Sequence, residues 1–180
     1  MSGNRGEKET ARPLLRLFYL ATIGIVVLDQ ISKYAAVRLL GDGGSVPVLD
    51  QVFHLTLVYN TGIAFGLFQS HPQLLKVLIS LSIIILFWIG RRMVAESGGH
   101  PGGASQTFRL NHWGIILITG GAIGNWIDRM RFGAVVDFLD FRIWPVFNIA
   151  DTVISIGIGL YFIQLISNRG HHPDQHQGAA

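Results

Sequence analysis

Long apolar runs separated by polar connectors dominate the hydrophobic pattern of this chain. Four such runs lie at about 14–37, 73–90, 110–128 and 147–166. A helix rises about 1.5 Å per residue, so roughly 20 apolar residues are enough to cross the hydrocarbon of a bilayer. The pattern therefore predicts an all-α membrane protein with four transmembrane helices.

The connectors between these runs differ in kind. The first, at about 38–73, is rich in β-branched and aromatic residues that partly alternate with polar ones, which predicts a small β-rich sheet on the outer membrane surface. The second contains the stretch "AESGGHPGGASQ", whose Gly and Ser are typical of a flexible loop. We expect one domain at 13–166 between cytoplasmic tails at 1–12 and 167–180, and the composition of both tails predicts disorder.

Basic residues near the ends of the runs predict the orientation, because Lys and Arg are enriched in cytoplasmic loops. The N-terminal segment and the second connector carry seven of them: Arg5, Lys8, Arg12, Arg16, Arg91, Arg92 and Arg109. Both termini and the second connector are therefore expected in the cytoplasm, with the first and third connectors outside. The third connector has arginines of its own, which we interpret as partners of nearby aspartates: Arg129, Arg131 and Arg142.

Composition supports a membrane protein and excludes several kinds of chemistry. Of 180 residues, 49% are hydrophobic and 14% charged, whereas about a quarter are charged in a typical soluble domain. The net charge of +3 is too small to indicate a nucleic-acid surface. The absence of Cys excludes thiol nucleophiles and thiolate metal sites, and there is no HExxH or GxSxG motif. We expect neither a metal nor another cofactor.

Polar residues near the ends of the apolar runs are candidates for function, because ionisable groups in a membrane are energetically costly. In "DQISK", Asp29 and Lys33 are four residues apart and share a helix face, so they can pair. A snorkelling lysine with its counter-ion would explain them equally well. In "NTGIAF", Asn60 belongs to a sequence that also fits an ordinary turn.

The end of the third run carries "GGAIGNWIDRM". Gly120 and Gly124 form a small-residue face that allows another helix to approach closely. Asn125, Asp128 and Arg129 are spaced so that they project near one level of the helix bundle. Helix packing together with a local Asp–Arg pair is an alternative explanation for this motif.

The fourth run begins with "FNIAD". After Pro145, Asn148 can cap the helix, and Asp151 then lies in the first turn, where the helix dipole favours a negative charge. Capping alone would therefore account for Asp151. Asp137 in "GAVVDF" has apolar neighbours and belongs to the same short connector.

Two carboxylates close together at a dry boundary cannot both ionise easily, so such a pair shares a proton. An aspartic protease uses this arrangement: one carboxylate takes a proton from water while the other donates a proton to the scissile carbonyl. Asp137 and Asp151 are the candidates for such a pair.

Together, "DQISK", "NTGIAF", "GNWIDRM", "GAVVDF" and "FNIAD" resemble the motifs of lipoprotein signal peptidase (signal peptidase II), a family of bacterial inner-membrane aspartic proteases. The resemblance covers about 14–166. It implies four transmembrane helices, an outward-facing β-rich cradle and a short interfacial helix. It also implies prolipoprotein substrates whose diacylglyceryl-modified Cys follows the scissile bond, contact with membrane lipids, inhibition by globomycin and a site near the outer face.

The resemblance assigns Asp137 and Asp151 as the catalytic dyad. It also implies residues that line or support the site: Asp29, Lys33, Asn60, Gly121, Asn125, Arg129 and Asn148. Asp128 is expected to orient Arg129. The proposed site needs one chain, so a monomer is expected.

Two other classes of function fit the pattern less well. In a proton-coupled transporter, acids usually lie near the middle of the membrane, whereas most of these lie near the ends of the runs. In a non-enzymatic assembly protein, the polar motifs would serve helix packing, and changes at Asp137 and Asp151 would alter stability rather than turnover.

Overall fold

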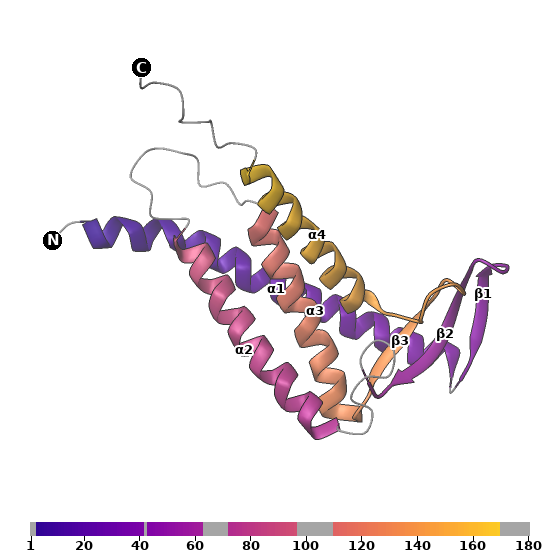
Figure 1. Cartoon of the computed structure of the whole chain (residues 1–180). Coiled ribbons are helices and arrows are strands. Elements are labelled where there is room, and N and C mark those ends of the chain that lie inside the picture. Colours follow the sequence, from indigo (N-terminus) through magenta and orange to yellow (C-terminus); the bar gives the residue numbers. More distant parts are fainter. Residues whose placement is uncertain (1–2, 42, 63–71, 97–109, 170–180) are drawn as a thin grey trace, which may run out of the picture.

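The computed structural model describes residues 3–41, 43–62, 72–96 and 110–169. Four helices and three strands occur in these ranges (Figure 1). In chain order they are α1 (Gly3–Leu40), β1 (Ser45–Leu49), β2 (Phe53–Asn60), α2 (Pro72–Glu96), α3 (Leu110–Phe132), β3 (Val135–Asp140) and α4 (Ile149–Arg169). The helices form a bundle, and the sheet lies at one end of it (Figure 1).

Three of the four described helices are long and apolar enough to cross a membrane, in the segments Arg12–Leu40, Gln73–Glu96 and Ile149–Ser167. Large apolar side chains are exposed along them, as expected for surfaces that face lipid. Helix α3 is not in this set, and its residues include Asn, His, Asp, Arg and several Gly. Because α3 packs against all three other helices, much of its surface faces protein instead of lipid. Its crossing of the membrane remains a prediction.

The helices are longer than the apolar runs. Helix α1 begins at Gly3, so the prediction of disorder is wrong for residues 3–12. That segment contains Glu, Lys, Ala and Arg, which have good helix propensity, and it continues directly into the apolar span. Disorder is likewise wrong for residues 167–169, which extend α4 by almost one turn. Residues 170–180 lie outside the described residues.

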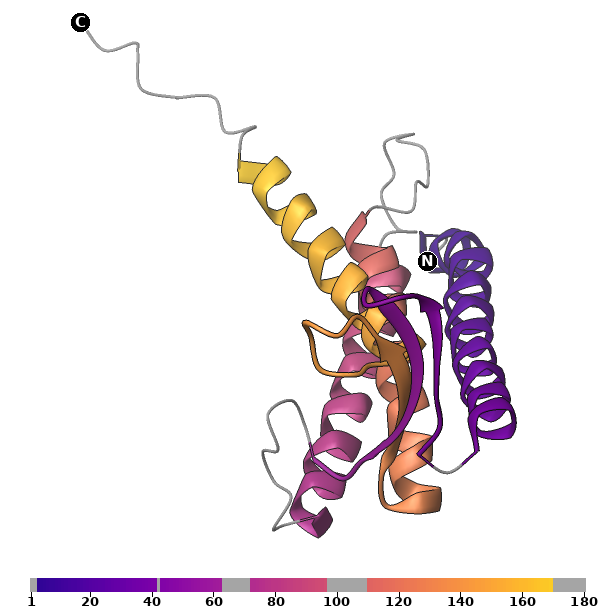
Figure 2. The same cartoon turned by 90° about the vertical axis from the view of Figure 1, so that its right-hand side faces the viewer.

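The strands form an antiparallel sheet in the order β1-β2-β3. Strands β1 and β2 confirm the predicted β-rich segment, and the third strand comes from the connector after α3. Gly133, with φ of 76°, ends α3 in a left-handed conformation and turns the chain into β3. In the view turned by 90°, the sheet lies in front of the helix bundle and curves across it (Figure 2).

The register of β2 and β3 places distant motifs together. Asn60 pairs with Val135, and Val58 pairs with Asp137. The described residues contain no helix besides the four named, so the expected short interfacial helix is not found there. Residues 63–71, with the rest of the "NTGIAF" motif, lie outside them.

The two ends of the bundle differ in their buried residues. Away from the sheet, Phe18, Val94, Ile115 and Ile116 form an apolar core between α1, α2 and α3. Near the sheet, polar and charged side chains are buried instead, among them Asp29, Lys33, Asn125, Asp128, Asp137 and Asn148. Such groups must be paired to be tolerated, so their hydrogen bonds define the candidate site.

Candidate active site

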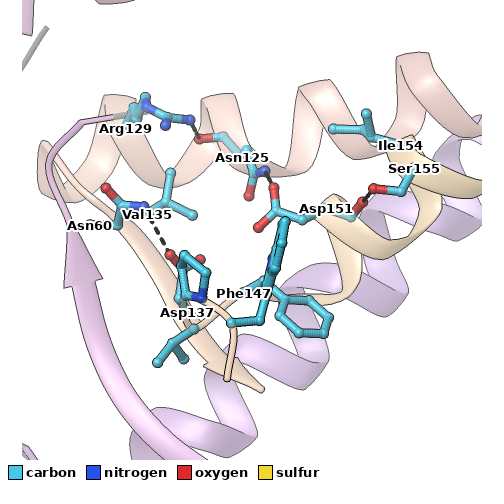
Figure 3. Close-up of a pocket in the computed structure, with 12 residues that line it drawn as sticks. Asn60, Asn125, Arg129, Val135, Asp137, Phe147, Asp151, Ile154 and Ser155 are labelled. Atoms are coloured by element: carbon cyan, nitrogen blue, oxygen red, sulfur yellow. Dashed lines mark hydrogen bonds between the residues drawn. The ribbon is translucent and has the colours of Figure 1, made fainter. Parts of the chain in front are cut away.

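A pocket of about 280 Å³ lies where the sheet meets α3 and α4 (Figure 3). Five of the predicted site residues line it: Asn60, Asn125, Arg129, Asp137 and Asp151. They come from β2, α3, β3 and α4. The tertiary structure thus brings together side chains that are up to 91 positions apart between Asn60 and Asp151.

Asp137 points into this pocket from β3, although only 2% of its surface is exposed. Its Oδ1 accepts a 2.6 Å hydrogen bond from Asn148 Nδ2, and its Oδ2 accepts a 3.1 Å hydrogen bond from Asn60 Nδ2. Burial, and next the negative charge of Asp151, raise the pKa of Asp137 from 3.8 to about 7. At neutral pH this carboxyl group can therefore hold a proton or release it.

Asp151 lies in the first turn of α4, three residues after the helix cap Asn148. Its backbone N–H donates to Asn148 Oδ1 at 2.9 Å, and the Asn148 backbone N–H donates back to Asp151 Oδ2 at 3.3 Å. This reciprocal pattern is a capping box. The capping interpretation therefore holds, and Asp151 also lines the pocket.

Two amide side chains connect the two carboxylates. Asn125 Nδ2 donates to Asp151 Oδ1 at 2.8 Å (Figure 3), and Asn125 Oδ1 accepts from Asn148 Nδ2 at 3.0 Å. Asn148 Nδ2 also donates to Asp137. The acids are thus held in one hydrogen-bonded network, and their charges affect each other. That they share a proton remains a prediction.

A buried ionic cluster lies next to the pocket. Lys33 Nζ is 2.8 Å from Asp29 Oδ2 and 2.9 Å from Asp128 Oδ2, and all three side chains are nearly fully buried. The expected pairing of Asp29 with Lys33 is therefore confirmed. Asp29 also accepts a 3.0 Å hydrogen bond from the backbone of Ala150, which links α1 to the start of α4.

Asp128 contributes to this cluster in a way that the sequence did not indicate. It was expected to orient its neighbour Arg129, but its carboxylate binds Lys33 and accepts hydrogen bonds from Gln30 Nε2 at 2.9 Å and the Val136 backbone at 3.2 Å. That expectation is wrong, because α1 supplies a closer cation on the face that Asp128 occupies. Asp128 thereby ties β3 to α3 and α1.

Arg129 binds the backbone just after β2 instead. Its Nη2 donates to the Gly62 carbonyl at 2.8 Å, while the Gly62 N–H donates to Asn60 Oδ1 at 3.0 Å. Arg129 therefore fixes the end of β2 beside the pocket and places a positive charge in the pocket wall. Arg142 forms its predicted ion pair, with Nη1 3.1 Å from Asp140 Oδ2. Arg131 does not pair with an aspartate among the described residues; its guanidinium lies 4.8 Å from the centre of the Phe132 ring.

Three glycines of α3 allow the close helix approach that the site needs. A Cβ at Gly120 would lie 2.8 Å from Ile25 of α1, and one at Gly124 would collide with the Asp29 carboxylate. The predicted small-residue face is thus confirmed. Gly121, expected to support the site, faces α4, where a Cβ would lie 2.6 Å from the Ala150 carbonyl oxygen. It supports the site through packing.

Several residues in and beside the pocket were not predicted. Gln30 completes the ionic cluster, and Trp144, Phe147 and Ser155 line the pocket. An apolar groove of about 550 Å³ adjoins the pocket, shares these three residues and Asp151 with it, and also includes Ile143. The aromatic stretch "FRIWPVF", which shares Phe147 with "FNIAD", was the available signal for this groove. In the described part of the chain, no three His, Cys, Asp or Glu side chains are grouped to hold a metal ion.

The fold and the site define a helical membrane protein with two carboxyl groups, one buried and one partly buried, in a pocket at one end of its bundle. Residues 21–167 match the family described as signal peptidase (SPase) II. The chain therefore belongs to the signal peptidase II family, and it is a bacterial membrane peptidase.

Individual relatives and solved structures agree. The lipoprotein signal peptidase of Desulforapulum autotrophicum is 39% identical over 167 residues, covering 88% of this chain and 96% of that protein. The enzyme of the same name from Nostoc punctiforme is 43% identical over 151 residues, covering 79% and 85%. A solved bacterial membrane enzyme superposes with a TM-score of 0.72 at 27% identity, covering 89% of this chain and 94% of that one.

Proposed function

We propose that this protein is an aspartic endopeptidase that removes the signal peptide from diacylglyceryl-modified prolipoproteins, with Asp137 and Asp151 as its catalytic dyad. The observation that carries the proposal is that both carboxylates line one pocket and are joined by the amides of Asn125 and Asn148. The relatives' shared name, lipoprotein signal peptidase, supports the substrate class.

The raised pKa of Asp137, about 7, supports a division of roles in the reaction. Asp151, ionised, takes a proton from a water molecule, whose oxygen attacks the carbonyl carbon before the lipidated Cys. Asp137, protonated, donates its proton to the carbonyl oxygen. When the tetrahedral intermediate collapses, the C–N bond breaks, the Asp151 proton passes to the leaving amine, and Asp137 recovers its own proton.

The surroundings of the dyad suit a lipidated peptide. Asn60 and Arg129 line the pocket and offer hydrogen-bond donors to a substrate backbone. The adjoining groove, with Trp144, Phe147 and Ile143 in its wall, offers an apolar surface to the acyl part of the substrate beside the scissile bond. We place this end of the bundle at the outer membrane face, with both termini in the cytoplasm, and expect globomycin to compete for the pocket. One chain supplies every residue of the site, so we propose a monomer.

The direct test is cleavage of a diacylglyceryl-modified prolipoprotein by the purified protein in detergent. The parent chain is expected to release the signal peptide, with no effect of chelators. Asp137→Asn and Asp151→Asn are each expected to lower kcat by at least about 10³-fold while the protein stays folded, because each removes a proton-transfer group. Asp140→Asn is the matched control, because Asp140 lies on the same strand as Asp137 but binds Thr56 and Arg142 outside the pocket. Full activity of either dyad variant would refute the assignment.

A further inference from the structure

The side chain of Asn125 occupies a node between the ionic cluster and the dyad. Its Oδ1 accepts hydrogen bonds from Lys33 Nζ at 2.8 Å and from Asn148 Nδ2 at 3.0 Å. Its Nδ2 donates to Asp151 Oδ1 at 2.8 Å (Figure 3). Every polar atom of this amide is therefore engaged, and each bond depends on which way the amide is turned.

The neighbours of Asn125 leave a single orientation of this amide that satisfies them. An ammonium group can only donate, so the Asn125 atom that faces Lys33 must be the oxygen. Asn148 is fixed independently, because the Asp151 backbone N–H donates to its Oδ1 and thereby turns its Nδ2 toward Asn125. A turned amide would set N–H groups against two donors and an oxygen against the Asp151 carboxylate.

Lys33 is held for this contact and touches the pocket only through Asn125. It is 3% exposed and does not line the pocket. Its ammonium is held by Asp29 and Asp128 at 2.8 and 2.9 Å, so three hydrogen bonds fix its position. A purely structural role for Lys33 would account for its contacts with Asp29 and Asp128. It would not account for the third contact, with the neutral amide of Asn125 beside the dyad.

We propose that Lys33 is a positioning residue: it fixes the Asn125 amide so that an N–H group holds the Asp151 carboxylate toward the pocket. This inference rests on the proposed function and explains what holds Asp151 in the geometry of the dyad. Loss of Lys33 lowers the fraction of molecules in which Asp151 is held correctly. The effect falls on kcat more than on KM, because Lys33 does not reach the substrate.

A double-mutant cycle tests this inference in the cleavage assay. Lys33→Met is expected to lower kcat about 100-fold with KM changed less than about threefold, which is the size of effect that misplacement produces. Asn125→Ala is expected to lower kcat by a similar factor. The variant with both changes is expected to be no worse than Asn125→Ala, because Lys33 acts through Asn125. Additive losses in kcat would overturn the inference.

Gln30→Met is the matched control for stability. The Gln30 amide contacts the same two carboxylates, at 3.3 Å from Asp29 and 2.9 Å from Asp128, and also the Gly124 carbonyl, but it is not bonded to Asn125. We expect its kcat per folded molecule to stay within about threefold of the parent. If Gln30→Met lowers kcat as much as Lys33→Met does, the lysine has a structural role only and the inference is wrong.

A second variant and the parent chain separate the remaining outcomes. If Lys33→Met does not fold, the cycle uses Lys33→Met combined with Asp29→Asn, which removes one positive and one negative charge and so leaves the net charge of the buried cluster unchanged. Wild-type kcat in that background overturns the inference. Failure of the parent chain to cleave the substrate refutes the proposed function itself, whereas equal kcat in the parent and Lys33→Met refutes only the role of Lys33.

Discussion

Two pairs of aspartates lie near each other at the sheet end of the bundle, and they differ in their partners. Asp29 and Asp128 both contact the ammonium of Lys33, and backbone N–H groups bind each of them as well. Asp137 and Asp151 receive hydrogen bonds from neutral amides and line an open pocket. The first pair is in direct contact with a cation, and we call it the compensated pair. The second pair is held by neutral amides, and we call it the uncompensated pair.

The comparison explains how one small region can serve both structure and chemistry. The compensated pair joins α1, α3, β3 and α4 through bonds that lie outside the pocket. The uncompensated pair is held in place by amides that supply orientation without fixing its charge. Lys33 lies one amide away from Asp151, so the proposed positioning of Asp151 needs no direct ion pair with the lysine.

The largest expected effect is a loss of stability when one carboxylate of the compensated pair is removed. Asp128→Asn keeps the shape of the side chain but removes one of the two negative charges that contact the Lys33 ammonium. We therefore expect a loss of about 3 kcal/mol in unfolding free energy. Thermal unfolding in detergent would measure it. An unchanged Tm for this variant would show that the cluster is not what holds these elements together.

The uncompensated pair is expected to make the activity depend on pH near neutrality. Asp137 must be protonated to donate, and its pKa is about 7, so kcat should fall about tenfold per pH unit above that value. The pH profile of kcat between about 5 and 9 would show this limb. A profile that stays flat to pH 9 would contradict the role of Asp137 as the acid.

The same pKa predicts that Asp137→Asn changes stability in the opposite sense to Asp128→Asn. The pKa of Asp137 rises from 3.8 to about 7 on folding, so its stabilising protonation is fully present below about pH 4 and is lost as pH rises through 7. Above pH 7 the folded protein must bury a charge that Asn lacks. Asp137→Asn should therefore raise Tm at pH 8 by a few degrees and leave it nearly unchanged at pH 4. A lower Tm at pH 8 would contradict this.

Helix approach at the compensated pair can be tested with a matched pair of glycines. Gly124→Ala would press a methyl group against the Asp29 carboxylate, and we expect a destabilisation of about 2 kcal/mol. Gly159 of α4 has open space around its Cβ position, so Gly159→Ala should be neutral or slightly stabilising. Equal Tm changes in both variants would show that space at Gly124 is not limiting.

The smallest expected effect concerns the groove next to the uncompensated pair. Trp144→Ala should raise KM for a lipidated substrate about fivefold, because an aromatic surface for the acyl chains is lost. A control is Trp88→Ala, which changes an exposed Trp on α2 outside the site. A substrate analogue without acyl chains should be affected much less, and an equal KM change for both substrates would contradict the lipid role of the groove.

Much of this molecule could be predicted from the sequence because the signals are local. Apolar runs show where three spans lie, since helix length and lipid contact are set by neighbouring residues. Spacing along one helix was enough to pair Asp29 with Lys33 and to cap α4 with Asn148. The limits of the helices were less predictable, because polar turns such as residues 3–12 extend a helix without being apolar.

Only the tertiary structure decided which polar groups meet. Asp128 contacts a lysine 95 positions away instead of its neighbour Arg129, because α1 approaches α3 closely at Gly120 and Gly124. The register of β2 with β3 brings Asn60 within hydrogen-bond distance of Asp137. The capping box holds Asp151 in the wall of the same pocket. The sequence alone determined that two carboxylates lie near the ends of apolar segments. Packing decided that one pair contacts Lys33 directly and the other is held by neutral amides, because these contacts depend on distances across the bundle that no local pattern specifies.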